Sequence, residues 1–209
     1  MTTLTDIYDK MISNGSLEDD LCQREIVEQL ENISRQVSNL KKKSIFFRKS
    51  SDINGAYIWG GVGCGKSMLM DLFVENLSIP NRRVHFHAFM QEIHNSLHKA
   101  RSSGVKDPLA LVANEVIKNF KVLALDEMQI KDITDAMIVG RLFNLLFDGG
   151  VVIVTTSNRV PSELYKNGLN RQLFVPFIDL ISNRLSILNL RSKIDYRKSK
   201  LRGARVYFS

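Results

Sequence analysis

Apolar residues near the start of the chain recur at the spacing of a helix. Within residues 1–50 they follow one another at intervals of three or four positions, with polar residues between them. They are Ile26, Leu30, Ile33, Val37 and Leu40. This spacing places them on one helix face, so the pattern predicts a helical N-terminal segment over residues 1–54. Residues 41–55, from the Lys-Lys-Lys run to Asp-Ile-Asn-Gly, are typical of a connecting loop.

From residue 55 onward, short apolar runs alternate with longer helical stretches. The predicted strands are residues 57–59, 84–88, 122–125, 151–156 and 185–190. The predicted helices are residues 66–77, 89–102, a helix from 109, and 133–147. Such alternation predicts an α/β three-layer sandwich, with a mostly parallel five-stranded sheet covered by helices on both faces. Ligands on sheets of this kind bind at the carboxyl ends of the strands.

A glycine-rich segment follows the first predicted strand and opens the first helix of the α/β region. Its sequence, Gly-Gly-Val-Gly-Cys-Gly-Lys-Ser, satisfies the P-loop (Walker A) pattern G-x-x-x-x-G-K-[ST]. Glycines let backbone N–H groups turn toward phosphate oxygens, and the first helical turn adds unpaired N–H groups. We expect Lys66 to reach the β and γ phosphates and the Ser67 hydroxyl to bind Mg²⁺. The predicted nucleotide contacts are Gly60, Gly61, Val62, Gly63, Cys64, Gly65, Lys66, Ser67 and Met68.

Two adjacent carboxylates end the apolar strand at residues 122–125. We expect Asp126 to lie in the Mg²⁺ shell and Glu127, on the other side of the strand end, to orient and deprotonate a water molecule. Kinases of small molecules do not need such a glutamate, so Glu127 favours hydrolysis over phosphoryl transfer to a substrate hydroxyl. No Asn-Lys-x-Asp guanine-reading segment occurs in the sequence. ATP is therefore the expected nucleotide.

A polar residue, Asn158, follows the apolar run at residues 151–156. If this strand lies between the P-loop strand and the acidic strand, Asn158 stands beside the γ-phosphate and can position the attacking water. A polar residue after a strand is also ordinary turn chemistry. The P-loop and the acidic strand end favour the sensor role for Asn158.

Length and composition are those of one globular unit. The chain has 209 residues, 44% hydrophobic and 24% charged, and no apolar run approaches the roughly 20 residues of a membrane span. The N-terminus lacks the basic and apolar parts of an export signal, so we expect a cytoplasmic protein. Cys22 and Cys64 are expected to be reduced thiols.

The net charge of +7 is concentrated at the end of the chain. Residues 184–209 contain eight Lys or Arg and one acid, Asp195, while the preceding part is neutral overall. A basic tail of this kind can bind nucleic acid or an anionic membrane surface. A solvated or partner-facing end is the favoured interpretation; nucleic acid is not the expected partner, and peripheral contact with the inner membrane stays open.

All four histidines lie close together in the sequence. His85 and His87 are predicted on one strand face, and His94 and His98 are four residues apart on the next helix. This spacing could build a zinc site. Because no glutamate follows His94, the metalloprotease pattern is absent, and we expect no metal at these histidines.

The chain resembles the ZapE-type ATPases of bacterial cell division and their mitochondrial AFG-type relatives, a branch of the AAA+ superfamily. The resemblance is specific, because generic AAA+ proteins share only the nucleotide motifs. The matching segments are residues 55–67, 85–90, 126–129, 132–137, 156–158, 164–171, 177–178 and 195–197, with Tyr8, Gly15, Asp20 and Gln23 near the start.

The resemblance implies an ATPase that uses hydrolysis to remodel protein partners, in cell division or in membrane-protein quality control. It also implies a homo-oligomeric ring, such as a hexamer, in which an arginine finger reaches the γ-phosphate bound by the neighbouring subunit. Arg171 is the expected finger because it lies in a matching segment, and Arg184 is the alternative. Such a finger contributes roughly 10³ to 10⁵ in rate.

The chain departs from the family at two places. Met128 stands where the family usually has Phe, and the sequence stops at Ser209, where the family continues into a helical lid. We therefore expect an ATPase core over residues 55–196 and a basic tail over 197–209, without the lid. Two other hypotheses remain: a nucleotide-dependent binding module with little turnover, and a DNA-associated ATPase resembling helicase loaders.

Overall fold

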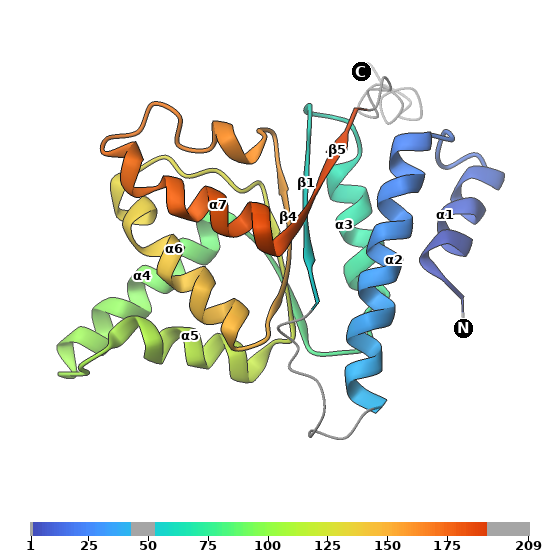
Figure 1. The fold of residues 1–209 in the computed structure, drawn as a ribbon. Coiled ribbons are helices and arrows are strands. Elements are labelled where there is room, and N and C mark those ends of the chain that lie inside the picture. Colours follow the sequence, from blue (N-terminus) through green and yellow to red (C-terminus); the bar gives the residue numbers. More distant parts are fainter. Residues whose placement is uncertain (1, 43–52, 192–209) are drawn as a thin grey trace, which may run out of the picture.

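The computed structural model describes residues 2–42 and 53–191, and it has one parallel sheet with helices on both faces (Figure 1). The strands are β1 (Gly55–Gly60), β2 (Asn81–His85), β3 (Val122–Asp126), β4 (Val152–Ser157) and β5 (Leu185–Leu190). Their order is β2-β3-β4-β1-β5, and every neighbouring pair is parallel. The predicted five-stranded α/β architecture is confirmed.

Helices form two layers, one against each face of the sheet (Figure 1). One layer contains α1 (Leu4–Ser13), α2 (Leu21–Lys42) and α3 (Lys66–Glu75). The other contains α4 (Phe86–Ser102), α5 (Pro108–Asn119), α6 (Ile133–Asp148) and α7 (Val175–Arg184). Two short 3-10 helices, η2 (Pro161–Glu163) and η3 (Arg171–Leu173), lie between β4 and α7.

The central strands bury side chains on both faces, which divides the interior into two apolar cores. On β4, Val152 and Val154 face the α1–α3 layer, whereas Ile153 faces the α4–α7 layer. The same alternation on β1 sends Ile58 to the first core and Tyr57 to the second. Successive side chains of a strand point to opposite faces, so a continuous apolar run is the expected pattern for a covered parallel sheet.

Helix α2 is part of the first core. Four of the five apolar positions predicted to share a helix face, Ile26, Leu30, Ile33 and Val37, are buried against this core, as predicted. The side chain of Leu40 lies outside the described residues, as does most of the predicted connector. The N-terminal segment therefore shares its apolar packing with α3 and the sheet.

The predicted strand over residues 84–88 is wrong at its boundaries. Strand β2 covers Asn81–His85, and α4 begins at Phe86. The apolar residues Phe86, Phe89, Met90 and Ile93 are spaced for one helix face and are buried, so core packing extends the helix back to Phe86. His87 consequently lies on a helix and does not share a strand face with His85.

The hydrophobic pattern did not predict helix α7, which covers Val175–Arg184. None of the helices within residues 2–42 and 53–191 combines the length and hydropathy needed to cross a bilayer. The predicted basic tail, residues 197–209, and the end of the predicted core at residue 196 lie outside the described residues.

Replacement of Leu30 tests whether α2 belongs to the folded core. Leu30 is 0% exposed, whereas Leu21 on the same helix is 76% exposed. We expect Leu30→Ala to lower the free energy of unfolding by about 2–5 kcal/mol, because it leaves a cavity, and Leu21→Ala to change it by less than about 0.5 kcal/mol. Urea titration followed by circular dichroism measures both. Equal, small effects would contradict the packing described for α2.

Candidate nucleotide-binding site

The P-loop, residues 60–67, connects the carboxyl end of β1 to the first turn of α3. Gly63 and Gly65 have φ values of 85° and 98°, a region that residues with a Cβ rarely adopt. Gly65 is also the residue that precedes α3, and no side chain of the residues that the structure describes caps this helix end. The N–H groups of the first turn are therefore free to bind an anion, which the positive end of the helix dipole also favours.

The Lys66 side chain lies inside the P-loop. Its Nζ donates to the carbonyls of Gly60 (2.8 Å) and Gly61 (2.5 Å) and lies 3.6 Å from Cys64 Sγ. Lys66 is buried, and its hydrogen-bond partners among the described residues are all uncharged. A buried ammonium without a paired carboxylate favours a bound anion, so the loop fits a phosphate group.

Arg83 on β2 joins the P-loop helix to the acidic end of β3. Its Nε donates to Asp126 Oδ2 at 2.6 Å, and its Nη2 donates to the Ser67 carbonyl at 3.3 Å. Arg83 also pairs with Asp71 on α3. Because one guanidinium contacts both segments, Ser67 and the Asp126 carboxylate lie close together. The sequence motifs predict that these segments meet, but they give no indication of Arg83.

Burial and charge act on Arg83 in opposite directions. Partial burial disfavours the charged guanidinium, but the two ion pairs outweigh that effect and raise the pKa of Arg83 above its ordinary value. Arg83 thus stays charged beside Asp126, which is itself 5% exposed. The ion pair orients a buried carboxylate at the strand end, where it can serve as a divalent-cation ligand.

Thr156 at the end of β4 holds the backbone of the acidic pair. Its hydroxyl accepts from the N–H of Glu127 (3.0 Å) and donates to Asp126 Oδ1 (3.4 Å). Glu127 has a φ of 56°, an uncommon conformation for a non-glycine residue. Asp126 is buried while Glu127 is exposed, so the two neighbouring carboxyl groups occupy different environments. Residues in such conformations cluster at functional sites.

Asn158 follows β4 at the same edge of the sheet. Strand β4 pairs with β1 on one side and with β3 on the other. It therefore lies between the P-loop strand and the acidic strand, which is the position that a γ-phosphate sensor at Asn158 requires. Asn158 is exposed, and the turn around it is fixed because Ser157 Oγ donates to the Met128 carbonyl and accepts from the N–H of Arg159. The carboxyl ends of β1, β3 and β4 thus bring together the P-loop, Asp126 and Asn158.

The two arginine-finger candidates lie in different surroundings. Arg171 begins η3, and its Nη2 donates to the Ser162 carbonyl at 2.6 Å, while its Nε is buried and has no hydrogen-bond partner within residues 2–42 and 53–191. Arg184 ends α7, and its guanidinium lies over the Phe147 ring, 5.1 Å from the ring centre. Since β5 begins directly after Arg184, this residue lies at the amino end of the sheet, away from the P-loop edge.

Helix α2 contacts the P-loop through Gln23, a residue for which the sequence motifs predict no chemical role. The Gln23 side chain is buried, its Nε2 donates to the Cys64 carbonyl, and its Oε1 accepts from the Tyr8 hydroxyl, each at 3.0 Å. A Cβ atom placed on Gly65 would lie 2.6 Å from this Nε2. A side chain at position 65 would therefore have to displace the Gln23 amide, in addition to adopting an unfavourable positive φ.

The four histidines do not form one cluster. His87 and His94 line a cavity of about 250 Å³ together with Asp132 and Asp135, and His94 Nε2 is hydrogen-bonded to Asp135 Oδ1 at 2.7 Å. His85 and His98 are not among the residues that line it. In the part of the chain that the structure describes, no three His, Cys, Asp or Glu side chains are grouped to hold a metal ion.

The sheet order, the glycine loop between β1 and α3, and the acidic end of β3 define a P-loop NTPase fold. Solved structures agree. AMPPCP-bound DnaA from Aquifex aeolicus aligns with a TM-score of 0.58 at 15% identity, covering 96% of this chain and 55% of DnaA. The crystal structure of DnaI aligns with a TM-score of 0.57 at 16% identity, covering 83% and 87%. At these identities the likeness describes the fold alone.

The chain belongs to the AFG1-like ATPase family, whose model matches residues 2–209. It is 37% identical to the cell division protein ZapE of Escherichia coli over 99% of this chain and 59% of ZapE. It is also 42% identical to lactation elevated protein 1 homolog B of Danio rerio, over 85% of this chain and 37% of that protein. The chain thus spans only part of the length of these curated relatives.

Ionisation of Tyr8 should weaken the fold at alkaline pH. Burial raises the pKa of Tyr8 to about 12 from its ordinary 10.0. The neutral phenol therefore contributes stability that is complete below pH 10 and is lost as the pH rises toward 12. We expect the stability difference between wild type and Tyr8→Phe to shrink over this interval by up to about 1.4 kcal/mol per pH unit. Urea titrations at pH 9, 10, 11 and 12 measure it.

The comparison with Tyr8→Phe isolates this residue. Burial also raises the pKa of Tyr57, but Tyr57 is present in both proteins and its effect cancels. A stability difference that stays constant from pH 9 to pH 12 would show that Tyr8 ionises with its ordinary pKa.

Proposed function

We propose that the chain binds ATP with Mg²⁺ and hydrolyses the γ-phosphate. The observation that carries the proposal is the junction built by Arg83. Its guanidinium holds the Asp126 carboxylate beside Ser67, directly after the loop that encloses the Lys66 ammonium. A positive loop that accepts phosphate and an adjacent carboxylate that accepts a divalent cation are the two halves of a site for a magnesium-bound triphosphate.

The P-loop supplies the phosphate contacts in this proposal. Backbone N–H groups within residues 60–68 contact the phosphate oxygens, and Lys66 moves its donors from the Gly60 and Gly61 carbonyls to the β and γ oxygens. The Ser67 hydroxyl and Asp126 would hold Mg²⁺. When bound, Mg²⁺ neutralises charge that develops on the phosphates.

Hydrolysis requires a base and a positioned water. Glu127 is exposed at the strand end and can accept a proton from water, while Thr156 fixes the Glu127 backbone. Asn158, at the end of the strand between the P-loop strand and the acidic strand, can hold the same water through its side-chain amide. The difference in burial between Asp126 and Glu127 supports this division of roles, because the metal ligand is fixed and the base meets solvent.

Replacement of Glu127 separates binding from turnover. We expect Glu127→Gln to retain nucleotide affinity within about threefold and to lower kcat at least about 100-fold, because the amide cannot accept the proton. Calorimetry with AMPPNP and Mg²⁺ and a phosphate-release assay measure the two quantities. The matched control is Glu163→Gln on η2, whose carboxylate pairs with Lys166 on the surface and should leave kcat unchanged.

The same two assays also test the low-turnover alternative. Unchanged phosphate release by Glu127→Gln would refute Glu127 as the base. Negligible release by the wild type at every protein concentration, with nucleotide binding retained, would instead favour a nucleotide-dependent binding module.

We propose further that copies of the chain assemble in a ring, with Arg171 completing the site of the neighbouring copy. The segment around Arg171 exposes large apolar side chains: Leu169 is 71%, Leu173 63% and Val175 37% exposed. An exposed apolar patch of this kind is typical of a protein interface. An arginine at its centre has the chemistry of a finger for the γ-phosphate.

Turnover of Arg171→Ala against protein concentration tests this assembly. We expect wild-type kcat per subunit to rise with concentration as rings form, and Arg171→Ala to stay at the low-concentration rate, at least about 100-fold lower at saturation. Arg101→Ala, an exposed arginine on α4, is the control and should follow the wild type. The same measurement on Arg184→Ala separates the two candidates. A wild-type rate per subunit that is independent of concentration would contradict the ring.

The partners in this proposal are proteins. The name of the E. coli relative, a cell division protein, supports clients from the division machinery, and the family resemblance leaves membrane-protein quality control as the other class. We propose a cytoplasmic site of action with at most peripheral membrane contact. The likeness to DnaA and DnaI concerns the fold alone and gives no support to a nucleic-acid partner.

A further inference from the structure

We propose that Gln23 is a positioning residue of the nucleotide site, through which the α1–α2 hairpin controls the affinity of the P-loop. This inference rests on the proposed function, because it concerns the same loop. On α2, Gln23 Nε2 donates a hydrogen bond to the Cys64 carbonyl of the P-loop at 3.0 Å. The two residues are far apart in the sequence, and both are buried.

Peptide planarity gives this bond its effect on the loop. The carbonyl of Cys64 and the N–H of Gly65 belong to one trans peptide unit, so they point in opposite directions. When Gln23 holds the carbonyl toward α2, the Gly65 N–H must point away from α2, toward the interior of the loop. The residue after this peptide bond, Gly65, has a φ of 98°, and glycine adopts positive and negative φ about equally well, so the backbone itself gives little preference for one orientation of the unit. Gln23 therefore selects the orientation that binds phosphate.

The Gln23 amide is itself held in one orientation. The Cys64 carbonyl can only accept, so the NH₂ group must face the loop and Oε1 must face Tyr8, whose hydroxyl donates to it. The α2 backbone at this point is capped by Asp20, whose Oδ1 accepts from the N–H of Gln23 at 3.3 Å.

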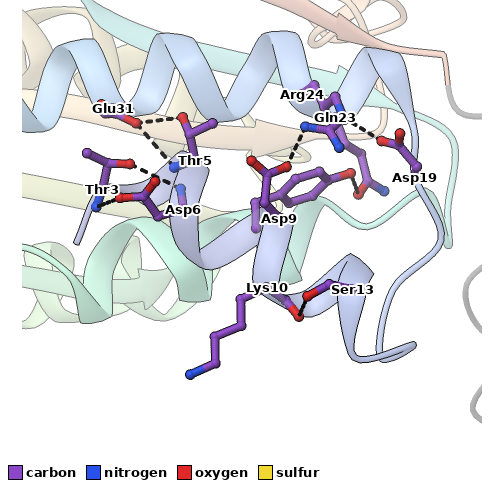
Figure 2. A network of polar contacts seen from close by, with 11 residues as sticks. Thr3, Thr5, Asp6, Asp9, Lys10, Ser13, Asp19, Gln23, Arg24 and Glu31 are labelled. Atoms are coloured by element: carbon purple, nitrogen blue, oxygen red, sulfur yellow. Dashed lines mark hydrogen bonds and ion pairs between the residues drawn. The ribbon is translucent and has the colours of Figure 1, made fainter.

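Charged contacts on the surface join α1 to α2 beside this amide (Figure 2). Arg24, the residue after Gln23, pairs with Asp9 on α1 and with Asp19 before α2, at 2.6 and 2.5 Å. Its guanidinium also lies 5.6 Å from the centre of the Tyr8 ring. The position of α1 thus decides whether Tyr8 can donate to Gln23, and a displacement of α1 would release the amide that orients the P-loop.

The experiment compares nucleotide affinity with stability in a series of variants. Gln23→Met keeps the side-chain volume and removes both hydrogen bonds. We expect it to weaken AMPPNP binding in the presence of Mg²⁺ about tenfold, measured by calorimetry well below the unfolding midpoint, because the Cys64 carbonyl loses its partner. Leu30→Ala, in the same helix but away from the loop, should lower the unfolding midpoint and leave affinity within about twofold of wild type.

A double variant separates positioning from general stability. Gln23→Met alone leaves the buried Tyr8 hydroxyl without this acceptor, and Tyr8→Phe removes that hydroxyl. Tyr8→Phe/Gln23→Met should therefore recover part of the unfolding midpoint relative to Gln23→Met, yet bind AMPPNP as weakly as Gln23→Met. If affinity recovers with the midpoint, or if Leu30→Ala loses affinity in proportion to its stability, Gln23 is only a structural residue and the proposal is wrong.

Lys66→Ala distinguishes this outcome from failure of the proposed function. Wild-type binding that is lost in Lys66→Ala and unchanged in Gln23→Met would refute the role of Gln23 alone. AMPPNP affinity that is equally absent in the wild type and in Lys66→Ala would refute the proposed function, and the inference about Gln23 with it.

Discussion

If the N–H groups of the P-loop are to bind phosphate, the carbonyl groups of the same loop need hydrogen-bond donors from other side chains. Buried carbonyls without partners are costly, so a phosphate-binding loop depends on the donors that surround it. In this protein Lys66 satisfies the carbonyls of Gly60 and Gly61 from within, and Gln23 satisfies that of Cys64 from α2. The shape of the loop therefore depends on a helix that precedes it by many residues.

The carboxyl edge of the sheet carries the second half of the site, and its geometry follows from strand order. Because β4 is inserted between β1 and β3, a hydroxyl at its end can reach the acidic pair on β3. Thr156 uses this position to hold Glu127 in its strained conformation, and β2 on the outer side contributes Arg83. Neighbouring strands thus support the acidic strand end from both sides.

Patterns that are local in the sequence predicted most of the fold and pointed to the segments that form the candidate site. The alternation of short apolar runs with longer helical stretches was enough to predict a five-stranded, mostly parallel sheet. The glycine spacing was enough to predict a P-loop between the first strand and the helix that follows it. The boundary near residue 85 was predicted wrongly because the alternating His-Phe-His run satisfies strand and helix patterns alike, and only burial of Phe86 against the α4 face decides between them.

The supporting contacts could not be predicted because they join distant segments. Arg83 meets Asp126, Gln23 meets Cys64, and Thr156 meets Glu127 across large sequence separations. Each side chain is of a common type with no spacing rule of its own. Two weak signals were present: an arginine pair in a short strand leading to the site edge, and a glutamine in a matching segment near the start. Neither signal indicates a partner without the tertiary structure.

The shared core of α2 and α3 means that this nucleotide site is not a detachable module. Its sequence motifs begin at Gly55, yet its spatial boundary includes the hairpin that packs over α3 and touches the loop. Transplanting only the stretch from β1 to β5 would carry over the recognisable motifs. It would also expose the apolar face of α3 that packs against α2 and remove the hydrogen-bond donor of the Cys64 carbonyl. A transplanted segment that keeps the nucleotide site packed therefore includes α1 and α2 in addition to the motifs.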